Sequence, residues 1–231
     1  MGLQTLILGI GNLLWADEGF GVRAVEHLHQ HYEFAPNVSL MDGGTQGIYL
    51  AHHVGQADLL VVFDAIDYGL APGTLKLIEG DSVPKFMGAK KMSLHQTGFQ
   101  EVLALAEFLG HYPKHLLLVG VQPVQLEDFG GSLSPLTREQ IPHAINAALA
   151  WLGKLGIHAT RRQQPLSETQ LLAGAEVNMQ SYESQRPDTS VACRVGDERV
   201  LQSADYQVQY RPHQLDPENT IGCDVDHRGK Y

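Results

Sequence analysis

The chain has 231 residues, of which 43% are hydrophobic, and its formal net charge is −10. This length and apolar content suit one ample domain with an appendage, or two small domains. The negative charge argues against nucleic acids and anionic membranes as partners. The two cysteines, Cys193 and Cys223, are too few for a disulfide scaffold and lack the C-x-x-C spacing of a metal site. No apolar run approaches the roughly 20 residues of a membrane span, and the first predicted strand leaves no room for a signal peptide. We therefore expect a cytoplasmic protein that binds neither nucleic acid nor membrane.

The first predicted strand, residues 5–10, breaks at a glycine turn and is followed by a predicted amphipathic helix over residues 18–31. A strand that passes into a helix in this way delivers the next polar side chains to the carboxyl edge of a sheet. Open α/β proteins build their sites at that edge. The group delivered here is the carboxylate of Glu18.

Strand and helix signals then alternate along the chain. Three other predicted strands are nearly continuous apolar runs and cover residues 38–41, 59–63 and 116–121. A fifth predicted strand, residues 74–79, follows a Pro-Gly turn and is expected at the sheet edge. The other predicted helices cover residues 46–54, 96–109, which follows a capping box at residues 93–96, and 141–155. This alternation is typical of the α/β class, and it predicts a three-layer α/β/α sandwich with a mostly parallel, twisted sheet.

The composition changes after about residue 159. The segment that follows is rich in Gln, Ser, Asp and Arg, and it carries weak strand signals at residues 190–195 and 199–202 around a Gly-Asp turn. We therefore divide the chain into a domain at residues 1–159 and a polar extension at residues 160–231, with a hairpin and irregular structure expected in the extension.

Three side chains fall at equivalent places in the predicted architecture. Glu18 begins the helix after the first strand, Asp64 closes a buried strand, and His95 lies in the first turn of a helix. Carboxyl ends of strands and amino ends of the following helices lie on one rim, so these side chains are able to converge. Two carboxylates and an imidazole suit a divalent ion such as zinc or nickel.

Each of these residues also has an ordinary structural explanation. The helix dipole favours an acid such as Glu18 in a first turn, an acid such as Asp64 at a strand end often caps a turn, and a lone His95 is usually a surface or packing residue. The segment Asp42-Gly43-Gly44 is a further strand-end acid, with glycines that allow close backbone approach. Its alternative is a simple tight turn.

Gly9 and Gly11 raise the alternative of a nucleotide-binding α/β enzyme. The dinucleotide fingerprint G-x-G-x-x-G requires a third glycine where Leu14 stands, although Asp42 does provide an acid at the end of the second strand. The sequence contains no H-E-x-x-H, G-x-S-x-G or P-loop motif. A bound nucleotide is therefore not expected.

A set of short blocks, in this order and at compatible spacing, resembles the [NiFe]-hydrogenase maturation endopeptidases between about Leu3 and Ile157. The blocks are Leu8-Gly9-Ile10-Gly11-Asn12, Asp17-Glu18-Gly19, Gly21-Val22, Asp42-Gly43-Gly44-Thr45, Asp64-Ala65-Ile66, Ser93-Leu94-His95-Gln96 and Gly120-Val121-Gln122-Pro123. Any one block alone is a weak signal, whereas the ordered set is specific. The extension has no counterpart in the short members of the family.

The resemblance implies a metal site and a catalytic centre at Glu18, Asp64 and His95. We expect Asp42, Gly43 and Gly44 to bind the peptide or to support the metal-binding residues. It also implies removal of a C-terminal extension from the hydrogenase large-subunit precursor after nickel has been inserted. Nickel would then be carried by the substrate, and its presence would be the checkpoint for cleavage. Either carboxylate, Glu18 or Asp64, is a candidate general base. We expect a monomer.

A second class of function stays open beside the peptidase. A chaperone or metal-sensing adaptor would bind the same precursor without cutting it. All three expected ligand positions are occupied in this sequence, which disfavours a loss of activity.

Overall fold

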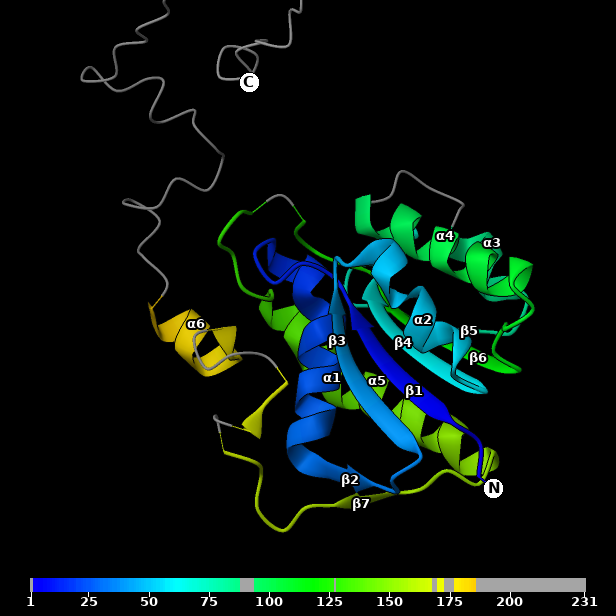
Figure 1. The fold of residues 1–231 in the computed structure, drawn as a ribbon. Helices are drawn as coiled ribbons and strands as arrows, with labels where there is room; N and C mark the ends of the chain where they lie inside the picture. Colours follow the sequence, from blue (N-terminus) through cyan, green and yellow to red (C-terminus); the bar gives the residue numbers. More distant parts are fainter. Residues whose placement is uncertain (1, 88–93, 127, 168–169, 173–176, 186–231) are drawn as a thin grey trace, which may run out of the picture. The chain divides into compact units, whose positions relative to one another are not determined.

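The computed structural model describes residues 2–87, 94–126, 128–167, 170–172 and 177–185, without the side chains of residues 85–87 and 94–97. Its centre is a five-stranded sheet (Figure 1). The strands, in sheet order, are β3 (Val38–Gly44), β1 (Thr5–Ile10), β4 (Leu59–Ala65), β6 (His115–Val121) and β5 (Leu75–Glu79). The first four are parallel, and β5 pairs antiparallel with β6 at the edge. The predicted strands and the mostly parallel sheet are confirmed.

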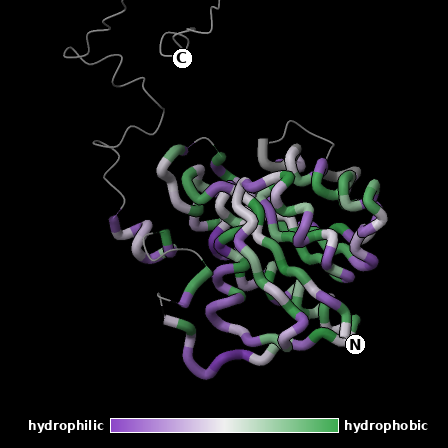
Figure 2. The backbone as a smooth tube through the Cα atoms, viewed as in Figure 1, coloured by the Kyte–Doolittle hydropathy of each residue, from purple (hydrophilic) through white to green (hydrophobic). Residues whose placement is uncertain are grey.

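Helices cover both faces of this sheet (Figure 1). One face packs against α1 (Phe20–His31) and α5 (Pro135–Lys154). The other face packs against the 3-10 turn η2 (Gly47–Leu50), α2 (Ala51–Gly55), α3 (Ser82–Met87) and α4 (Leu94–Phe108). Strands buried on both sides need side chains that are apolar throughout, which explains the continuous runs in β1, β4 and β6 and the hydrophobic colour of the central strands in Figure 2. The chain is a three-layer α/β/α sandwich.

Helix α1 lies unusually close to the sheet because glycines meet at the contact. A Cβ atom added to Gly21 would lie 2.1 Å from the carbonyl oxygen of Phe63 and 2.2 Å from that of Ile10. A Cβ atom on Gly9 would lie 2.3 Å from the carbonyl oxygen of Gly21. No side chain fits at either position, so these glycines fix how near the start of α1 comes to the ends of β1 and β4.

Three predicted helices differ from the structure at their ends. The first begins with a 3-10 turn, η1 (Ala16–Gly19), and the predicted helix over residues 46–54 is divided between η2 and α2. Helix α5 begins at Pro135, well before the predicted residue 141, because Ser134 caps it and accepts a hydrogen bond from the backbone N–H of Thr137 at 3.4 Å. The capping residue proposed for α4, Ser93, lies outside the described residues.

The first part of the predicted extension packs against the sandwich. Strand β7 (Ala159–Arg161) pairs antiparallel with β2 (Tyr32–Phe34), and Leu172 and Met179, at the start of α6 (Met179–Gln185), pack against the cluster under α1 and α5. The predicted hairpin at residues 190–202 lies outside the described residues, and the domain boundary at residue 159 stays a prediction. Within the described part of the chain, no helix is long and apolar enough to cross a membrane.

Candidate active site

The three predicted site residues belong to elements that meet at the carboxyl edge of the parallel strands. Glu18 lies in η1, directly after β1, and Asp64 is the penultimate residue of β4. Turn η1 contacts β4, so the two carboxylates come from neighbouring parts of the edge. His95 is the second residue of α4.

Asp64 is on the face of the sheet that α4 covers. Side chains alternate along β4: Val61 and Phe63 pack under α1 and α5, whereas Leu60 and Val62 pack under α2 and α4. The same alternation places Asp64 with Leu60 and Val62, toward the layer that carries His95. The Asp64 side chain is fully buried, with 0% exposure. A buried carboxylate at a strand end is unusual and is a candidate functional group.

Glu18 is held by its backbone and is only partly buried. Gly11 has a φ of +138°, and a Cβ atom on it would lie 1.8 Å from the carbonyl oxygen of Glu18. Position 11, in the predicted turn, therefore requires glycine. This glycine lets η1 fold back onto the end of β1 and fixes Glu18 beside the edge of the sheet.

Helix α4, which carries His95, lies next to η2, the turn that follows β3. A Cβ atom on Gly98, one turn beyond His95, would lie 3.3 Å from the Cα atom of Gly47 in η2. The two backbones are therefore in close contact, and the start of α4 is on the same side of the sheet as the loop after β3. The side chain of His95 lies outside the described atoms.

Asp42, Gly43 and Gly44 lie at the end of β3, beside the end of β1. The register shifts at this point, where Gly9 pairs with Asp42 and Ile10 with Gly44. Asp42 Oδ1 accepts a hydrogen bond of 2.9 Å from the N–H of Gly44, which has a positive φ of 45°. Burial raises the pKa of the Asp42 carboxyl. The segment is thus a tight turn at the candidate edge, and its predicted peptide-binding role stays a prediction.

Asp17, beside Glu18, has a structural role that the sequence does not indicate. Its side chain is 0% exposed and accepts five hydrogen bonds. The donors are the backbone N–H groups of Val124 (2.8 Å), Gln125 (3.0 Å) and Ser134 (2.7 Å) and the hydroxyls of Ser134 (2.9 Å) and Thr137 (2.9 Å). Asp17 therefore fastens the loop between β6 and α5 to the turn that holds Glu18. Two adjacent acids in a sequence do not reveal which of them is buried.

A second loop at the edge is fastened by Gln122, which follows β6. Its side-chain oxygen accepts hydrogen bonds from the backbone N–H groups of Tyr68 (2.8 Å) and Leu70 (3.1 Å), and its amide nitrogen donates to Asp67 at 3.0 Å. The Tyr68 ring lies over Gly120, where a Cβ atom would meet the phenol oxygen at 2.8 Å. Gly120 is paired with Asp64, and burial together with the Asp64 charge raises the pKa of the Tyr68 phenol.

The described side chains include no group of three or more His, Cys, Asp or Glu that could hold a metal ion. Of the predicted ligand set, only Glu18 and Asp64 have described side chains. The ligand set with His95 therefore stays a prediction. Chemically, the edge offers two carboxylates of different exposure, suited to binding a cation or accepting a proton.

The fold and this edge define the class of the protein: an α/β sandwich with an acidic site where the parallel strands end. Residues 22–151, more than half of the chain, match the family model described as hydrogenase maturation protease. The chain is 62% identical to the hydrogenase expression/formation protein HupD of Thiocapsa roseopersicina over 200 residues, which is 87% of this chain and 90% of that protein. It is 40% identical to the hydrogenase 2 maturation protease of Escherichia coli over 162 residues, which is 70% of this chain and 98% of that protein.

A solved structure of the hydrogenase maturating endopeptidase HybD from Escherichia coli has the same fold. It superposes with a TM-score of 0.66 at 39% identity and covers 69% of this chain and 98% of that chain. The chain belongs to the hydrogenase maturation protease family. The members of this family are endopeptidases, so the protein is a hydrolase.

Proposed function

We propose that this peptidase removes a C-terminal extension from the [NiFe]-hydrogenase large-subunit precursor, and that it recognises nickel already bound to that substrate. The observation that carries the proposal is the pair of carboxylates at the carboxyl edge, Glu18 from η1 and Asp64 from β4. The resemblance of the sequence blocks around them to the family is the reason for proposing them as metal ligands. The first residues of α4, which bring His95, are on the same side of the sheet.

In this mechanism Glu18, Asp64 and His95 contact the nickel ion of the precursor and so place the adjoining peptide at the edge. A metal ion held there polarises a carbonyl or acidifies a water molecule. One of the two carboxylates accepts the proton from the attacking water. Because the ion belongs to the substrate, a precursor without nickel lacks the group that these side chains bind, and cleavage depends on metal loading.

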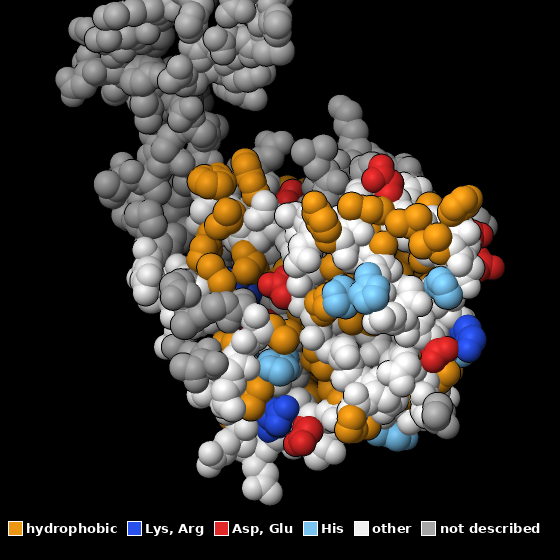
Figure 3. All heavy atoms as spheres, viewed as in Figure 1, with side chains coloured by type: hydrophobic (Ala, Val, Ile, Leu, Met, Phe, Trp, Pro, Cys, Tyr) orange, Lys and Arg blue, Asp and Glu red, His pale blue; other side chains and the backbone are white. Residues whose placement is uncertain are grey.

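Exposed apolar side chains around the edge suit the binding of an extended peptide. Leu14 follows β1, Val124 and Phe129 follow β6, and Tyr49, 81% exposed, lies in η2 after β3. In Figure 3 apolar side chains gather along the upper margin of the visible face, where Figure 1 places the ends of β1 and β3. Apolar surface gathered beside a polar site is typical of a protein-binding region.

The decisive test is cleavage of the purified large-subunit precursor, loaded or unloaded with nickel, by the wild type and by Glu18→Gln. We expect release of a C-terminal peptide only with nickel, and a rate at least about 100-fold lower for the variant. Equal cleavage of both forms of the precursor would contradict nickel recognition. Stable binding without cleavage under every condition would instead assign the protein to the adaptor class.

A second variant, His95→Ala, separates the site from the fold. We expect the variant to keep the wild-type circular dichroism spectrum and to leave uncleaved precursor, because a metal contact is lost. Normal processing by this variant would remove His95 from the site. The expected cytoplasmic location, the monomeric state and the absence of nucleic-acid or membrane partners stay predictions.

A further inference from the structure

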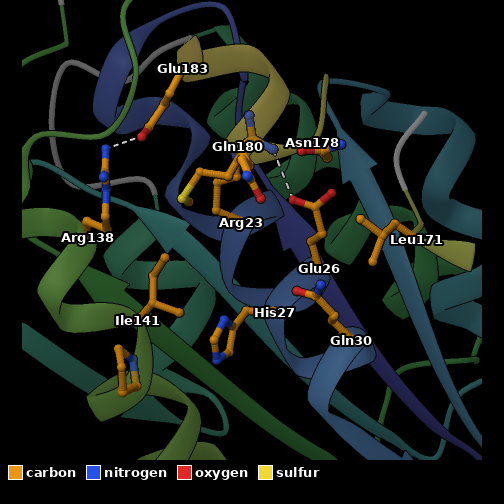
Figure 4. A pocket seen from close by; sticks show the side chains of 12 residues that line it. Arg23, Glu26, His27, Gln30, Arg138, Ile141, Leu171, Asn178, Gln180 and Glu183 are labelled. Carbon is orange, nitrogen blue, oxygen red and sulfur yellow. Dashed lines mark hydrogen bonds and ion pairs between the residues drawn. The ribbon is translucent and has the colours of Figure 1, made fainter. Parts of the chain in front are cut away.

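A cavity separate from the carboxylate edge lies between α1, α5, Leu171 and residues 178–183 (Figure 4). Its volume is about 480 Å³, within the range of small-ligand pockets. Helix α1 contributes Arg23, Glu26 and His27 to its wall, and α5 contributes Arg138 and Ile141. Nothing in the proposed cleavage reaction uses these side chains.

The α1 wall holds a buried ion pair. Arg23 and Glu26 are only 3% and 6% exposed, and Arg23 Nη1 lies 2.9 Å from Glu26 Oε2. The Arg23 guanidinium also donates to the carbonyl oxygen of Val177 and lies 5.7 Å from the centre of the Tyr182 ring. These contacts hold the Arg23 guanidinium in place. It donates to only one of the two carboxylate oxygens of Glu26, Oε2.

The other oxygen of Glu26 is incompletely satisfied. Glu26 Oε1 is buried and has no hydrogen-bond partner among the described residues, although buried carboxylate oxygens normally have one. Burial raises the pKa of the Glu26 carboxyl in spite of the neighbouring Arg23. An acceptor of this kind, in the wall of a cavity, is a place for a donor that the ligand brings.

The opposite wall presents a complementary group. Arg138 forms an ion pair with Glu183 through Nη2, while its Nε–H group is buried without a hydrogen-bond partner among the described residues. Between the two walls the lining is apolar, with Ile141 and Pro142 from α5 and Leu171 opposite them. Figure 4 shows Arg138 and Glu26 on opposite sides of the cavity, with Ile141 on the Arg138 side.

We propose that this cavity binds a basic amino-acid residue. The cationic end of the residue donates to Glu26 Oε1, its aliphatic stem lies along Ile141 and Leu171, and its carbonyl oxygen accepts from Arg138 Nε. The neighbouring His27 does not repel such a cation, because burial and the nearby His31 lower the pKa of His27 to about 4 and keep it neutral. The site goes beyond the proposed cleavage function and does not depend on it.

The test is a calorimetric titration of the full chain with N-acetylarginine amide and with the matching citrulline derivative. Citrulline has nearly the same shape, but its urea group is neutral, so it isolates the charge. We expect the arginine probe to bind and the citrulline probe to bind at least about tenfold more weakly, a difference of about 1.4 kcal/mol. Absence of binding, or equal binding of the two probes, would overturn the proposal.

Variants locate the site. Glu26→Gln should abolish arginine binding, whereas Glu139→Gln should leave it unchanged, because Glu139 is an exposed acid on α5 that does not line the cavity. Gln180→Trp, at an exposed residue that lines the cavity, should block binding without touching Glu26, and it decides the matter if Glu26→Gln does not fold. Unchanged binding in a folded Glu26→Gln or Gln180→Trp variant would contradict the assignment.

The basic residue could be free in solution or part of a protein, and a competition experiment separates these sources. Inhibition of precursor cleavage by saturating arginine probe would assign the residue to the precursor. Unchanged cleavage would assign the site to a free solute. Both outcomes are compatible with the site, and the binding titration tests it even if cleavage cannot be reconstituted.

Discussion

Two buried acids, Asp17 before α1 and Glu26 within it, differ in how completely they are hydrogen-bonded. Asp17 accepts five hydrogen bonds, and its partners tie a loop and the start of α5 to the turn after β1. Glu26 accepts one from Arg23, and its second oxygen has no hydrogen-bond partner among the described residues. A saturated buried carboxylate stabilises a fold, whereas an unsaturated one in a cavity wall is available to a ligand. Burial alone therefore does not distinguish a structural acid from a binding acid.

The largest effect that tests this contrast is expected for Asp17→Asn. The amide keeps the shape of the carboxyl group, but its NH₂ group faces donors that it cannot satisfy. We expect a loss of about 3 kcal/mol or more in the free energy of unfolding, measured with urea. Glu139→Gln, at an exposed position of α5, is the control and should change stability by less than about 0.5 kcal/mol. Similar values for the two variants would remove the structural role of Asp17.

The second effect is a pH dependence from His27, at the cavity. Unfolded His27 binds a proton near pH 6.5, whereas the folded protein resists protonation until about pH 4. Stability should therefore fall as the pH falls through this window, by about 2 kcal/mol between pH 7 and pH 5. Urea midpoints at both pH values measure it. The loss should shrink in His27→Gln and persist in His52→Gln, at an exposed histidine of α2; equal losses in all three proteins would rule out His27.

A smaller effect on stability is expected for Ser134→Ala, which removes one of the hydrogen-bond donors of Asp17. Its hydroxyl donates to Asp17 and accepts from the N–H of Thr137, so the variant weakens both the Asp17 cluster and the start of α5. We expect a loss of about 1 kcal/mol in thermal or urea unfolding. Ser39→Ala, at an exposed position of β3, should be nearly neutral. A neutral Ser134→Ala would mean that the remaining donors suffice for Asp17.

The smallest effect is expected for Glu26→Gln. The glutamine oxygen still accepts a hydrogen bond from Arg23, and the change removes the buried charge whose desolvation raises the pKa of the Glu26 carboxyl, which offsets the loss of the ion pair. We expect a change of less than about 1 kcal/mol in the free energy of unfolding at pH 7. A loss as large as that of Asp17→Asn would show that Glu26 is a structural acid and would end the contrast.

The strands of the sheet can be predicted from the sequence because each strand is marked by its own consecutive residues, without knowledge of distant partners. The runs that became β1, β4 and β6 are apolar throughout, and only strands buried on both faces require that. Periodicity does not predict the start of α5, because the apolar pattern begins at Ile141, whereas the capping Ser134 and the first helical residue Pro135 lie nearly two turns earlier in polar sequence. Helix ends depend on single residues, and periodicity does not detect them.

The site was predictable in part, for a related reason. Glu18 and Asp64 follow strands, and strand ends meet at one edge whatever the sequence between them. Asp17 was not predictable as a buried acid, because its partners lie far along the chain at Val124 and Ser134. Arg23 and Glu26 are buried together with segments near Val177 and Tyr182, where the polar sequence gives no periodic signal.

The hydrogen bonds from Gln122 to the loop after β4 have a consequence for how fast a metal ion could bind. The Asp64 carboxyl has no contact with solvent, and Tyr68, over Gly120, belongs to this loop. In the proposed function a metal ion contacts Asp64, and because this carboxyl is fully buried, the ion reaches it only in a conformation that exposes it. The apparent affinity for the ion is then reduced by the fraction of molecules in that conformation. If motion of this loop exposes Asp64, the variant Gln122→Ala, which removes these hydrogen bonds, would increase both the association rate and the dissociation rate of the ion.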